Sequence, residues 1–368
     1  MHALVSIEPT QPHVFQKRLG TGWGLKAIVL AAGIGSRMNP LTSERPKHLL
    51  PVAGKPIVRR VIEVLSQVGV EEVRVVIGYM AEKIREALSD VRGIELSFSL
   101  QERPRGTADA LLAARDFVDR GERFVLVYGD VTVTREPLEE LIRRVEEGGL
   151  DGGLIGVVRH DPWRFGTLQV DGDLLVGIAE KSKEVRPPAL VNAGIYVLPG
   201  EVMELASSVP LSPRGEYELT DAVVGLVRRG RRIGVLRSEG SWWFDLGGPA
   251  ELLRANVVYL KRELGDGFRL GRGSVVMGGS SLRTAFVDEF VTLGPSSMVE
   301  ASALMRGSSV GRGAEVFESL VLEGAKVGEG VRIERCVIGS GSVVPEGTVL
   351  VGTQDEPVVI PPGTFVQR

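Results

Sequence analysis

The fold of most of this chain follows from one stretch, Lys26-Ala-Ile-Val-Leu-Ala-Ala-Gly-Ile-Gly-Ser-Arg-Met38. Its first residues form an aliphatic run typical of a buried strand, and glycines follow directly. Glycines just past a strand let backbone N–H groups turn towards a polyphosphate, and Arg37 adds a forked donor that suits phosphate oxygens. The motif is weak alone, because a tight turn in any α/β protein has the same glycines. The Walker lysine is absent, and Met38 stands where the dinucleotide-binding fingerprint requires its third glycine.

Around this stretch, from residue 25 to 265, short aliphatic runs alternate with longer amphipathic stretches. This alternation predicts an α/β fold, a Rossmann-like domain whose mixed, mainly parallel sheet is covered by helices. We expect strands at 26–30, 72–77 and 124–128, and helices at 57–65, 81–88, 107–118 and 137–147. Residues 1–24 lack the charged start and apolar middle of a signal peptide, so we expect an N-terminal extension.

A different pattern covers residues 266–368, where glycine rises and aliphatic residues recur every six residues. One six-residue unit is a short strand plus a corner, and three units make a triangular coil whose aliphatic side chains point into a shaft. This predicts a left-handed parallel β-helix of hexapeptide repeats; the alternative is a glycine-rich antiparallel domain. The series run in shifted frames, so we expect irregular coils: Leu270/Val276/Leu282, Val287/Leu293/Val299, Leu304/Val310/Val316/Leu322, Val321/Val327/Ile333 and Val331/Val337/Val343/Val349.

Composition narrows the possible partners and surroundings. The net charge of -3 gives no reason to expect nucleic acid or an anionic membrane as a partner. No apolar run reaches the ~18 residues of a transmembrane helix. Cys336 is the single cysteine, which excludes an internal disulfide and fits a reducing, cytoplasmic location.

Two longer runs carry a family resemblance: Leu30-Ala-Ala-Gly-Ile-Gly-Ser-Arg-Met-Asn-Pro-Leu-Thr42 and Arg45-Pro-Lys-His-Leu-Leu-Pro-Val-Ala-Gly-Lys-Pro-Ile57. Together they resemble the signature of the sugar-phosphate nucleotidyltransferases. The resemblance implies that Arg37 and Lys47 are catalytic. It also implies that Gly33, Gly35 and Ser36 bind the triphosphate together with Arg37, and that Leu30 and Ala32 belong to the same nucleotide-binding set.

The segment Gln101-Glu-Arg-Pro-Arg-Gly-Thr-Ala-Asp-Ala-Leu111 resembles the base-binding segment of that family. A glutamine amide can accept and donate hydrogen bonds, and a glycine backbone can approach a base closely. The spacing of Gln101 and Gly106 resembles that of members which use UTP or dTTP, and Thr107 belongs to the same nucleotide-binding set. Without the resemblance, this segment would be a loop and a helix start capped near Thr107.

Two aspartates are candidate metal ligands. Asp130 follows the strand at 124–128, and the carboxyl ends of parallel strands form the ligand crevice of open α/β sheets. Asp245 lies downstream in Trp242-Trp-Phe-Asp-Leu-Gly247. Aspartates before glycines are commonly turn residues. Because both match metal-binding positions of the family, we expect them to hold Mg²⁺, which prefers one or two carboxylates plus phosphate oxygens.

Further motifs occur along the chain in the same order as in the sugar-phosphate nucleotidyltransferases. The resemblance implies that Gly166, Glu180 and Asn192 bind sugar hydroxyls and that Lys181 binds the sugar phosphate; without it, Glu180 and Lys181 would be a solvated surface pair. We interpret Glu216-Tyr-Glu-Leu-Thr-Asp221 as a capped helix start beside the site, without assigning a role.

The resemblance implies a transferase that joins a sugar 1-phosphate, glucose 1-phosphate or N-acetylglucosamine 1-phosphate, to UTP or dTTP and releases pyrophosphate. GTP with mannose 1-phosphate is the alternative, and an inactive regulatory or assembly subunit is an alternative of another class. Acetyl transfer normally needs a histidine base near the acyl acceptor. The histidines of this chain are His2, His13, His48 and His160, and none lies in the β-helix, so an acetyltransferase β-helix is disfavoured. We expect the β-helix to form a homo-oligomer. We also expect deletion from residue 268 to spare the chemistry, provided that the first part remains folded.

Overall fold

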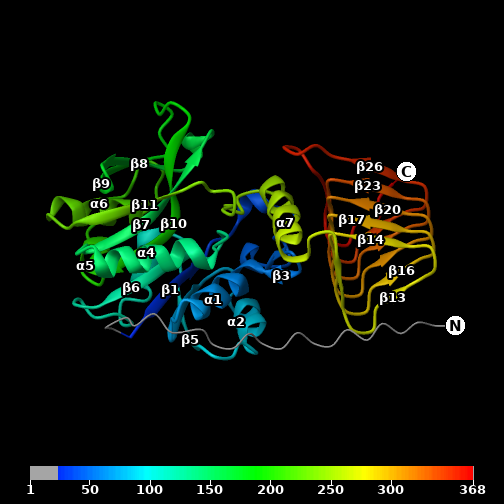
Figure 1. Cartoon of the computed structure of the whole chain (residues 1–368), viewed down its shortest axis with the longest axis horizontal. Helices are drawn as coiled ribbons and strands as arrows, with labels where there is room; N and C mark the ends of the chain where they lie inside the picture. The colour runs from blue at the N-terminus through cyan, green and yellow to red at the C-terminus, as the bar shows by residue number, and fades with distance from the viewer. Residues whose placement is uncertain (1–23, 368) are drawn as a thin grey trace.

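The computed structural model describes residues 24–367 (Figure 1). The predicted extension falls on residues 1–23 outside this range and on Gly24. A helix-covered sheet and a β-helix lie on either side of the long helix α7 (Pro249–Leu264). Within residues 24–367, no helix combines the length and apolar character needed to cross a bilayer.

The sheet has nine strands in the order β5-β4-β1-β6-β10-β7-β11-β9-β8. The four strands from β5 to β6 are all parallel, whereas β10 runs antiparallel to both β6 and β7, so the predicted mixed sheet is confirmed. The strands are β1 (Lys26–Ala31), β4 (Glu72–Ile77), β5 (Glu95–Leu100), β6 (Arg123–Tyr128), β7 (Gly152–Arg159), β8 (Gly166–Asp171), β9 (Leu174–Glu180), β10 (Ala189–Pro199) and β11 (Ile233–Ser238).

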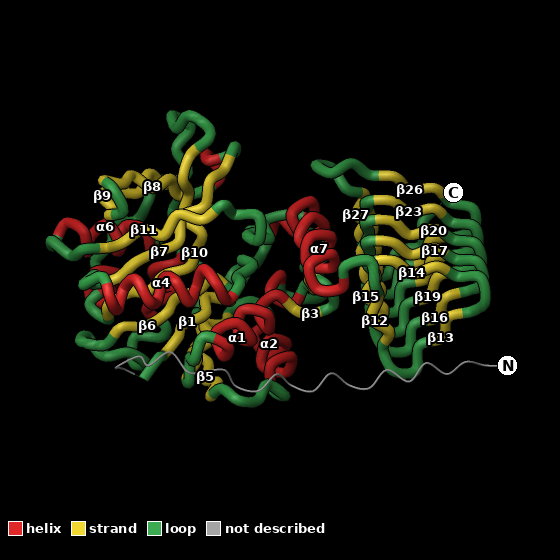
Figure 2. The backbone as a smooth tube through the Cα atoms, in the orientation of Figure 1, coloured by secondary structure: helices red, strands yellow, loops and turns green. Residues whose placement is uncertain are grey.

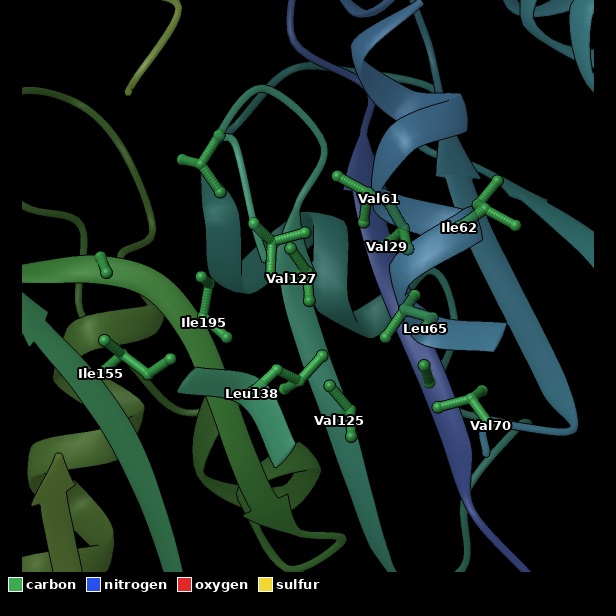
Figure 3. Close-up of a cluster of buried hydrophobic side chains, with 14 of the residues drawn as sticks. Val29, Val61, Ile62, Leu65, Val70, Val125, Val127, Leu138, Ile155 and Ile195 are labelled. Atoms are coloured by element: carbon green, nitrogen blue, oxygen red, sulfur yellow. The ribbon is translucent and has the colours of Figure 1, made fainter. Parts of the chain in front are cut away.

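Helices cover both faces of this sheet (Figure 2). One buried cluster joins the strands to α1 (Ile57–Gln67), α2 (Ala81–Leu88) and α4 (Arg135–Glu147). Figure 3 draws part of it, with Val61 and Leu65 of α1 beside Val29 of β1. The other face packs against α3 (Thr107–Leu112), α5 (Val202–Ala206) and α6 (Leu219–Arg228). The remaining short elements are η1 (Ser36–Met38), η2 (Lys47–Leu49), η3 (Pro162–Arg164), β2 (Pro51–Val52) and β3 (Lys55–Pro56).

The expected strands and helices form within a few residues of their predicted bounds, with one exception. The helix expected at 107–118 ends at Leu112. The amides of Ala114, Arg115 and Phe117 donate to carbonyls three residues earlier, so the chain tightens into turns instead of continuing the α-helix.

The β-helix consists of three parallel sheets, of six, five and five strands, which together give the arrangement expected of hexapeptide repeats. The first contains β12 (Phe268–Leu270), β15 (Ala285–Val287), β18 (Ala303–Leu304), β21 (Leu320–Val321), β24 (Cys336–Ile338) and β27 (Val358–Ile360). The second contains β13 (Val275–Val276), β16 (Thr292–Leu293), β19 (Ser309–Val310), β22 (Lys326–Val327) and β25 (Val343–Val344). The third contains β14 (Ser281–Arg283), β17 (Met298–Glu300), β20 (Glu315–Phe317), β23 (Arg332–Glu334) and β26 (Val349–Val351).

The expectation of irregular coils is wrong for the first four coils and correct for the last. Register pairs join Leu270 to Val287, Val287 to Leu304, Leu304 to Val321 and Val321 to Ile338, so each of the first four coils takes 17 residues with one short corner. The last coil is longer, because Ile338 pairs with Ile360 and a loop at 352–357 replaces the short corner. The short corner carries a left-handed backbone in each of these four coils, at Thr284, Ala301, Glu318 and Arg335. The apparent frame shifts arise because one corner of each of these coils is one residue shorter than in a strict six-residue repeat. Some aliphatic residues of the predicted series therefore point outward. Leu322 and Val337 are buried against α7, and Val349 is 62% exposed.

The sheet that begins with β12 shares a hydrophobic core with the first part of the chain. Phe286, Met305 and Leu322 pack with Leu50 and Tyr259 in one buried cluster that also includes residues of α1 and α7. Arg45 reaches across to Glu323, with Nη1–Oε1 and Nη2–Oε2 distances of 3.0 and 2.5 Å. Deletion from residue 268 would expose this cluster to solvent. The first part of the chain would therefore have difficulty remaining folded, which was the condition for its chemistry to survive the deletion.

Candidate active site

A cavity of about 450 Å³ opens at the carboxyl ends of β1 and β6. Every residue for which the sequence predicts a role lines it: Leu30, Ala32, Gly33, Gly35, Ser36, Arg37, Lys47, Gln101, Gly106, Thr107, Asp130, Gly166, Glu180, Lys181, Asn192 and Asp245. These residues come from eight separate segments of chain, and the fold brings all of them together.

The glycine loop packs against the side chain of Lys47. A Cβ on Gly35 would lie 2.9 Å from Cβ of Lys47, and the φ of Gly35 is +72°, so a larger residue there would be strained and crowded. A Cβ on Gly33 would lie 3.5 Å from Cε of the same lysine. The glycines therefore make room for Lys47 as well as for a ligand, a reason that the sequence does not reveal.

The Lys47 ammonium forms an ion pair with the carboxylate of Asp130, and both side chains are largely buried. Burial raises the pKa of Asp130, but the charge of Lys47 and the Lys47 hydrogen bond act in the opposite direction, and the net shift is downward. Burial and the nearby Asp130 raise the pKa of Asp245 to about 6, against the opposing charges of Lys47 and Arg37. The two carboxylates thus share one buried site, and the nearby cations do not fully balance the negative charge of Asp245.

Backbone contacts hold the two aspartates together. Val131 and Asp245 form an isolated antiparallel bridge, and the Leu246 amide donates to the Asp130 carbonyl at 2.9 Å. Trp243, behind Asp245, donates its indole N–H to the Ala193 carbonyl at 2.8 Å. Asp245 is therefore positioned by the sheet and by a buried tryptophan, and it is not an ordinary turn residue.

His48 is a feature that the sequence did not single out. It follows Lys47, is 1% exposed, and its Nδ1 has no hydrogen-bond partner within the described residues. Burial, with a smaller effect from the Lys47 charge, lowers its pKa to about 3, so the imidazole is neutral at pH 7. A neutral His48 adds no positive charge to the site.

Gln101 and Gly106 also line the cavity. Gln101 is 8% exposed, and the φ of Gly106 is +121°. A Cβ on Gly106 would fall 2.4 Å from the Tyr217 carbonyl, so this glycine is required by the loop that crosses it. The Thr107 hydroxyl accepts a hydrogen bond from the Leu219 amide at 2.9 Å, which places it at the start of α6 and not in the cap of its own helix.

In another part of the cavity wall, the β8–β9 hairpin pairs Gly166 with Glu180. A Cβ on Gly166 would lie 2.8 Å from Oε2 of Glu180, so glycine leaves room for that carboxylate. Burial and the charge of Glu218 raise the pKa of Glu180, and the Thr220 hydroxyl donates to it at 3.2 Å. Lys181 has a φ of +46°, a conformation uncommon outside glycine that tends to mark functional sites.

Asn192 lies at an irregularity in β10, where the register with β7 shifts between Asn192 and Tyr196. Its Oδ1 accepts from the Gly194 amide at 3.0 Å, and its Nδ2 donates to the Tyr196 hydroxyl. The predicted helix start at 216–221 is found at Leu219, and Glu216 and Glu218 line the same cavity.

Sequence reasoning missed two arginines of the cavity wall. Arg214 pairs with Glu218 at 2.5 Å and lies 3.5 Å from Glu180. Arg164 pairs with Glu251 at 2.5 Å, and a Cβ on Gly247 would lie within 3.5 Å of Asp245, Arg37 and Arg164. Each arginine lies within two residues of a motif that had been noticed, Gly166 or Glu216, and that proximity was the available signal.

Comparison with known proteins agrees with this geometry. A family model described as nucleotidyl transferase matches residues 26–262, and one described as GlmU-like, C-terminal hexapeptide matches residues 272–357. The "Bifunctional protein GlmU" of Methanococcus maripaludis is 35% identical over 240 residues, 65% of this chain and 55% of that relative. The chain thus spans only about half the length of that relative.

Two other relatives are covered more fully. The "UTP--glucose-1-phosphate uridylyltransferase AglF" of Haloferax volcanii is 34% identical over 62% of this chain and 93% of its own length. The "Glucose-1-phosphate thymidylyltransferase" of Streptomyces griseus is 29% identical over 78% of this chain and 88% of its own length. With the fold, the cavity and these matches together, the chain belongs to the nucleotidyl transferase family.

Proposed function

We propose that the chain is a sugar-1-phosphate nucleotidylyltransferase that uses UTP or dTTP with glucose 1-phosphate or N-acetylglucosamine 1-phosphate. The observation that carries the proposal is the joint presence of Lys47, Asp130, Asp245 and Arg37 at the strand ends of one cavity. The names of AglF and the Streptomyces griseus relative support the choice of UTP or dTTP and of glucose 1-phosphate.

In the proposed reaction, a phosphate oxygen of the sugar 1-phosphate attacks the α-phosphorus of the nucleotide. A new phosphorus–oxygen bond forms there as the bond to the β-phosphate breaks, and pyrophosphate leaves with that electron pair. The nucleophile is already an anion, so no proton needs to be removed. Catalysis then consists of positioning and charge neutralisation, in which Lys47 faces the α-phosphate and Arg37 the departing pyrophosphate.

Arg37 suits that role because it is exposed and makes no ion pair within residues 24–367. Lys47, in contrast, is held on Asp130, so its ammonium is fixed before a ligand arrives. At the sugar end, Gly166, Glu180 and Asn192 offer carbonyl, carboxylate and amide groups to hydroxyls. Lys181 supplies a cation for the sugar phosphate.

We assign a magnesium ion to Asp130 and Asp245. Both are buried, and Asp130 raises the pKa of Asp245, a repulsion that a bound cation would relieve. The described residues contain no group of three or more acidic, histidine or cysteine side chains arranged for a metal. A pair of carboxylates fits Mg²⁺, because this ion takes its other ligands from phosphate oxygens and water. When bound, the ion would supply positive charge to the reacting phosphates.

The β-helix carries a separate proposal. We place the domain division between residues 265 and 266, between the end of α7 at Leu264 and the start of β12 at Phe268. The first coil leaves Phe268, Leu270 and Val275 at least 45% exposed, which supports self-association through the β-helix. Light scattering of the full chain should give the mass of an oligomer, and a monomer mass would refute this part.

The proposed function is tested by incubating the purified chain with Mg²⁺, UTP and glucose 1-phosphate and following pyrophosphate. Release that requires both substrates supports it. The alternative substrates, GTP with mannose 1-phosphate, belong in the same assay, and an inactive regulatory subunit would release no pyrophosphate with any pair.

A further inference from the structure

The side-chain amide of Gln101 is fixed in one orientation. Its Nε2 donates to the Gly106 carbonyl at 3.1 Å and to Oδ2 of Asp109 at 2.8 Å. Both partners are acceptors, so the NH₂ end of the amide must face them. An NH₂ group has two hydrogens, and these two contacts use both.

The oxygen end of the same amide is what remains for a ligand. Within residues 24–367, Oε1 of Gln101 accepts no hydrogen bond, and Gln101 lines the cavity beside Gly106. Turning the amide over would bring Oε1 against the Gly106 carbonyl and the Asp109 carboxylate, and both hydrogen bonds would be lost. The site therefore presents an acceptor, and not a donor, to whatever binds there.

Asp109 is itself held in place. Its second oxygen accepts from Nη2 of Arg105 at 2.6 Å, and its side chain is 15% exposed while that of Arg105 is 58% exposed. The carboxylate thus lies between an arginine on the outside and the Gln101 amide on the inside. An aspartate in the first turn of α3 also has a purely structural use, because acids stabilise helix starts.

We propose that Asp109 is a specificity-determining positioning residue, which fixes the Gln101 amide so that the site selects a base with an N–H on its ring. Uracil, thymine and guanine carry such an N–H on their pairing edge, whereas cytosine and adenine carry a ring nitrogen that accepts. The inference rests on the proposed nucleotidyl transfer. It adds a residue and a physical reason for rejecting CTP, a nucleotide whose ring is the same size as that of UTP.

The test compares UTP with CTP in wild type, Asp109→Asn and Asp109→Ala, using kcat/KM for pyrophosphate release. Asp109→Asn keeps the shape but loses the carboxylate, so the Gln101 amide is no longer held in one orientation. We expect the wild type to prefer UTP and the ratio of UTP to CTP to fall about tenfold in both variants. Because each ratio is measured within one preparation, a loss of folded protein cancels.

Two controls separate this role from support of the helix. Asp116→Asn is the same substitution in the turn after α3, at a residue that pairs with Arg74 at 3.2 Å and does not contact Gln101. It should leave the ratio unchanged. In a Gln101→Ala background, Asp109→Asn should produce no further change in the ratio, because Asp109 then has no amide to orient.

A wild-type ratio retained in Asp109→Asn would overturn the inference and leave the proposed function standing. A wild type that does not discriminate UTP from CTP would do the same. If no nucleoside triphosphate supports pyrophosphate release with any sugar 1-phosphate, the proposed function itself fails, and the inference fails with it.

Discussion

The contact between Arg45 and Glu323 gives a prediction that links the β-helix to turnover. Arg45 lies two residues before Lys47, and its guanidinium also donates to the Ser340 hydroxyl at 2.6 Å. The loop that carries Lys47 is thereby tied to a coil of the β-helix. We predict that Glu323→Gln, which keeps the side-chain shape and removes the charge, will lower kcat.

The magnitude follows from burial and geometry. The pair is bidentate, with side chains 18% and 38% exposed, so it lies between a surface pair at about 0–1 kcal/mol and a broken buried pair at about 3–5 kcal/mol. We expect a loss of about 1–2 kcal/mol of stability. Because a displacement of about 1 Å at a reacting centre can cost about 10²-fold, a smaller displacement of Lys47 should lower kcat about tenfold.

The assay is pyrophosphate release at saturating substrates, well below the unfolding temperature, so that unfolding does not contribute. Asp355→Asn is the matched control, because Asp355 pairs with Arg254 at 2.6 Å across the same two parts of the chain without contacting the Lys47 loop. It should leave kcat unchanged. Combining Arg45→Glu with Glu323→Arg exchanges the two charges and keeps an ion pair, so kcat of the double variant should exceed that of either single substitution. Wild-type kcat in Glu323→Gln would refute the coupling.

The same pair predicts a pH dependence of stability. Burial raises the pKa of Glu323, but the Arg45 hydrogen bond and charge outweigh it and lower the pKa below its ordinary value of 4.5. A depressed carboxyl pKa contributes stability above the unfolded value, and this contribution is lost as the pH falls. The difference in melting temperature between wild type and Glu323→Gln should therefore shrink below pH 4.5 and persist at pH 7.

Three further predictions concern the cavity. Asp130→Asn should lower kcat by roughly 10²-fold or more, and EDTA should abolish wild-type activity until Mg²⁺ is restored; full activity in the chelator would contradict the metal assignment. Gly166→Ala should raise KM for the sugar 1-phosphate about tenfold, because the new methyl would crowd Glu180, while KM for UTP should stay constant; equal changes in both would argue against a sugar site there. His48 is buried with a pKa of about 3 and an unfolded value of 6.5, so urea denaturation should show stability falling by up to about 1.4 kcal/mol per pH unit below 6.5, and His48→Phe should flatten that slope.

Local patterns were sufficient to predict β1, β4 and β6 of the nine-stranded sheet, the helices α1, α2 and α4, and the presence of a β-helix. The run Lys26 to Leu30 followed by glycines requires a buried strand and a turn, and the structure has both. The 17-residue coil was not predicted, because outward residues such as Leu322 are as buried as shaft residues such as Val321. Hydrophobicity alone cannot separate a side chain that points into the shaft from one that packs against α7.

The family resemblance predicted the residues that line the candidate site. It did not predict the residues that hold them in place. Arg45 and Glu323 are separated by 278 positions, and no local pattern indicates that they meet. The orientation of Gln101 depends on Asp109 eight positions later, on a helix whose start had to be placed first. Such contacts follow from how elements pack, which periodicity does not encode.

Nucleotidyl transfer to a sugar 1-phosphate is tested most directly by a matrix of nucleoside triphosphates and sugar 1-phosphates assayed for pyrophosphate release with Mg²⁺. We expect release with UTP or dTTP and glucose 1-phosphate or N-acetylglucosamine 1-phosphate, at least about tenfold faster in kcat/KM than with ATP, GTP or CTP. A preference for GTP with mannose 1-phosphate would contradict the proposed substrates, and no release from any pair would contradict nucleotidyl transfer itself.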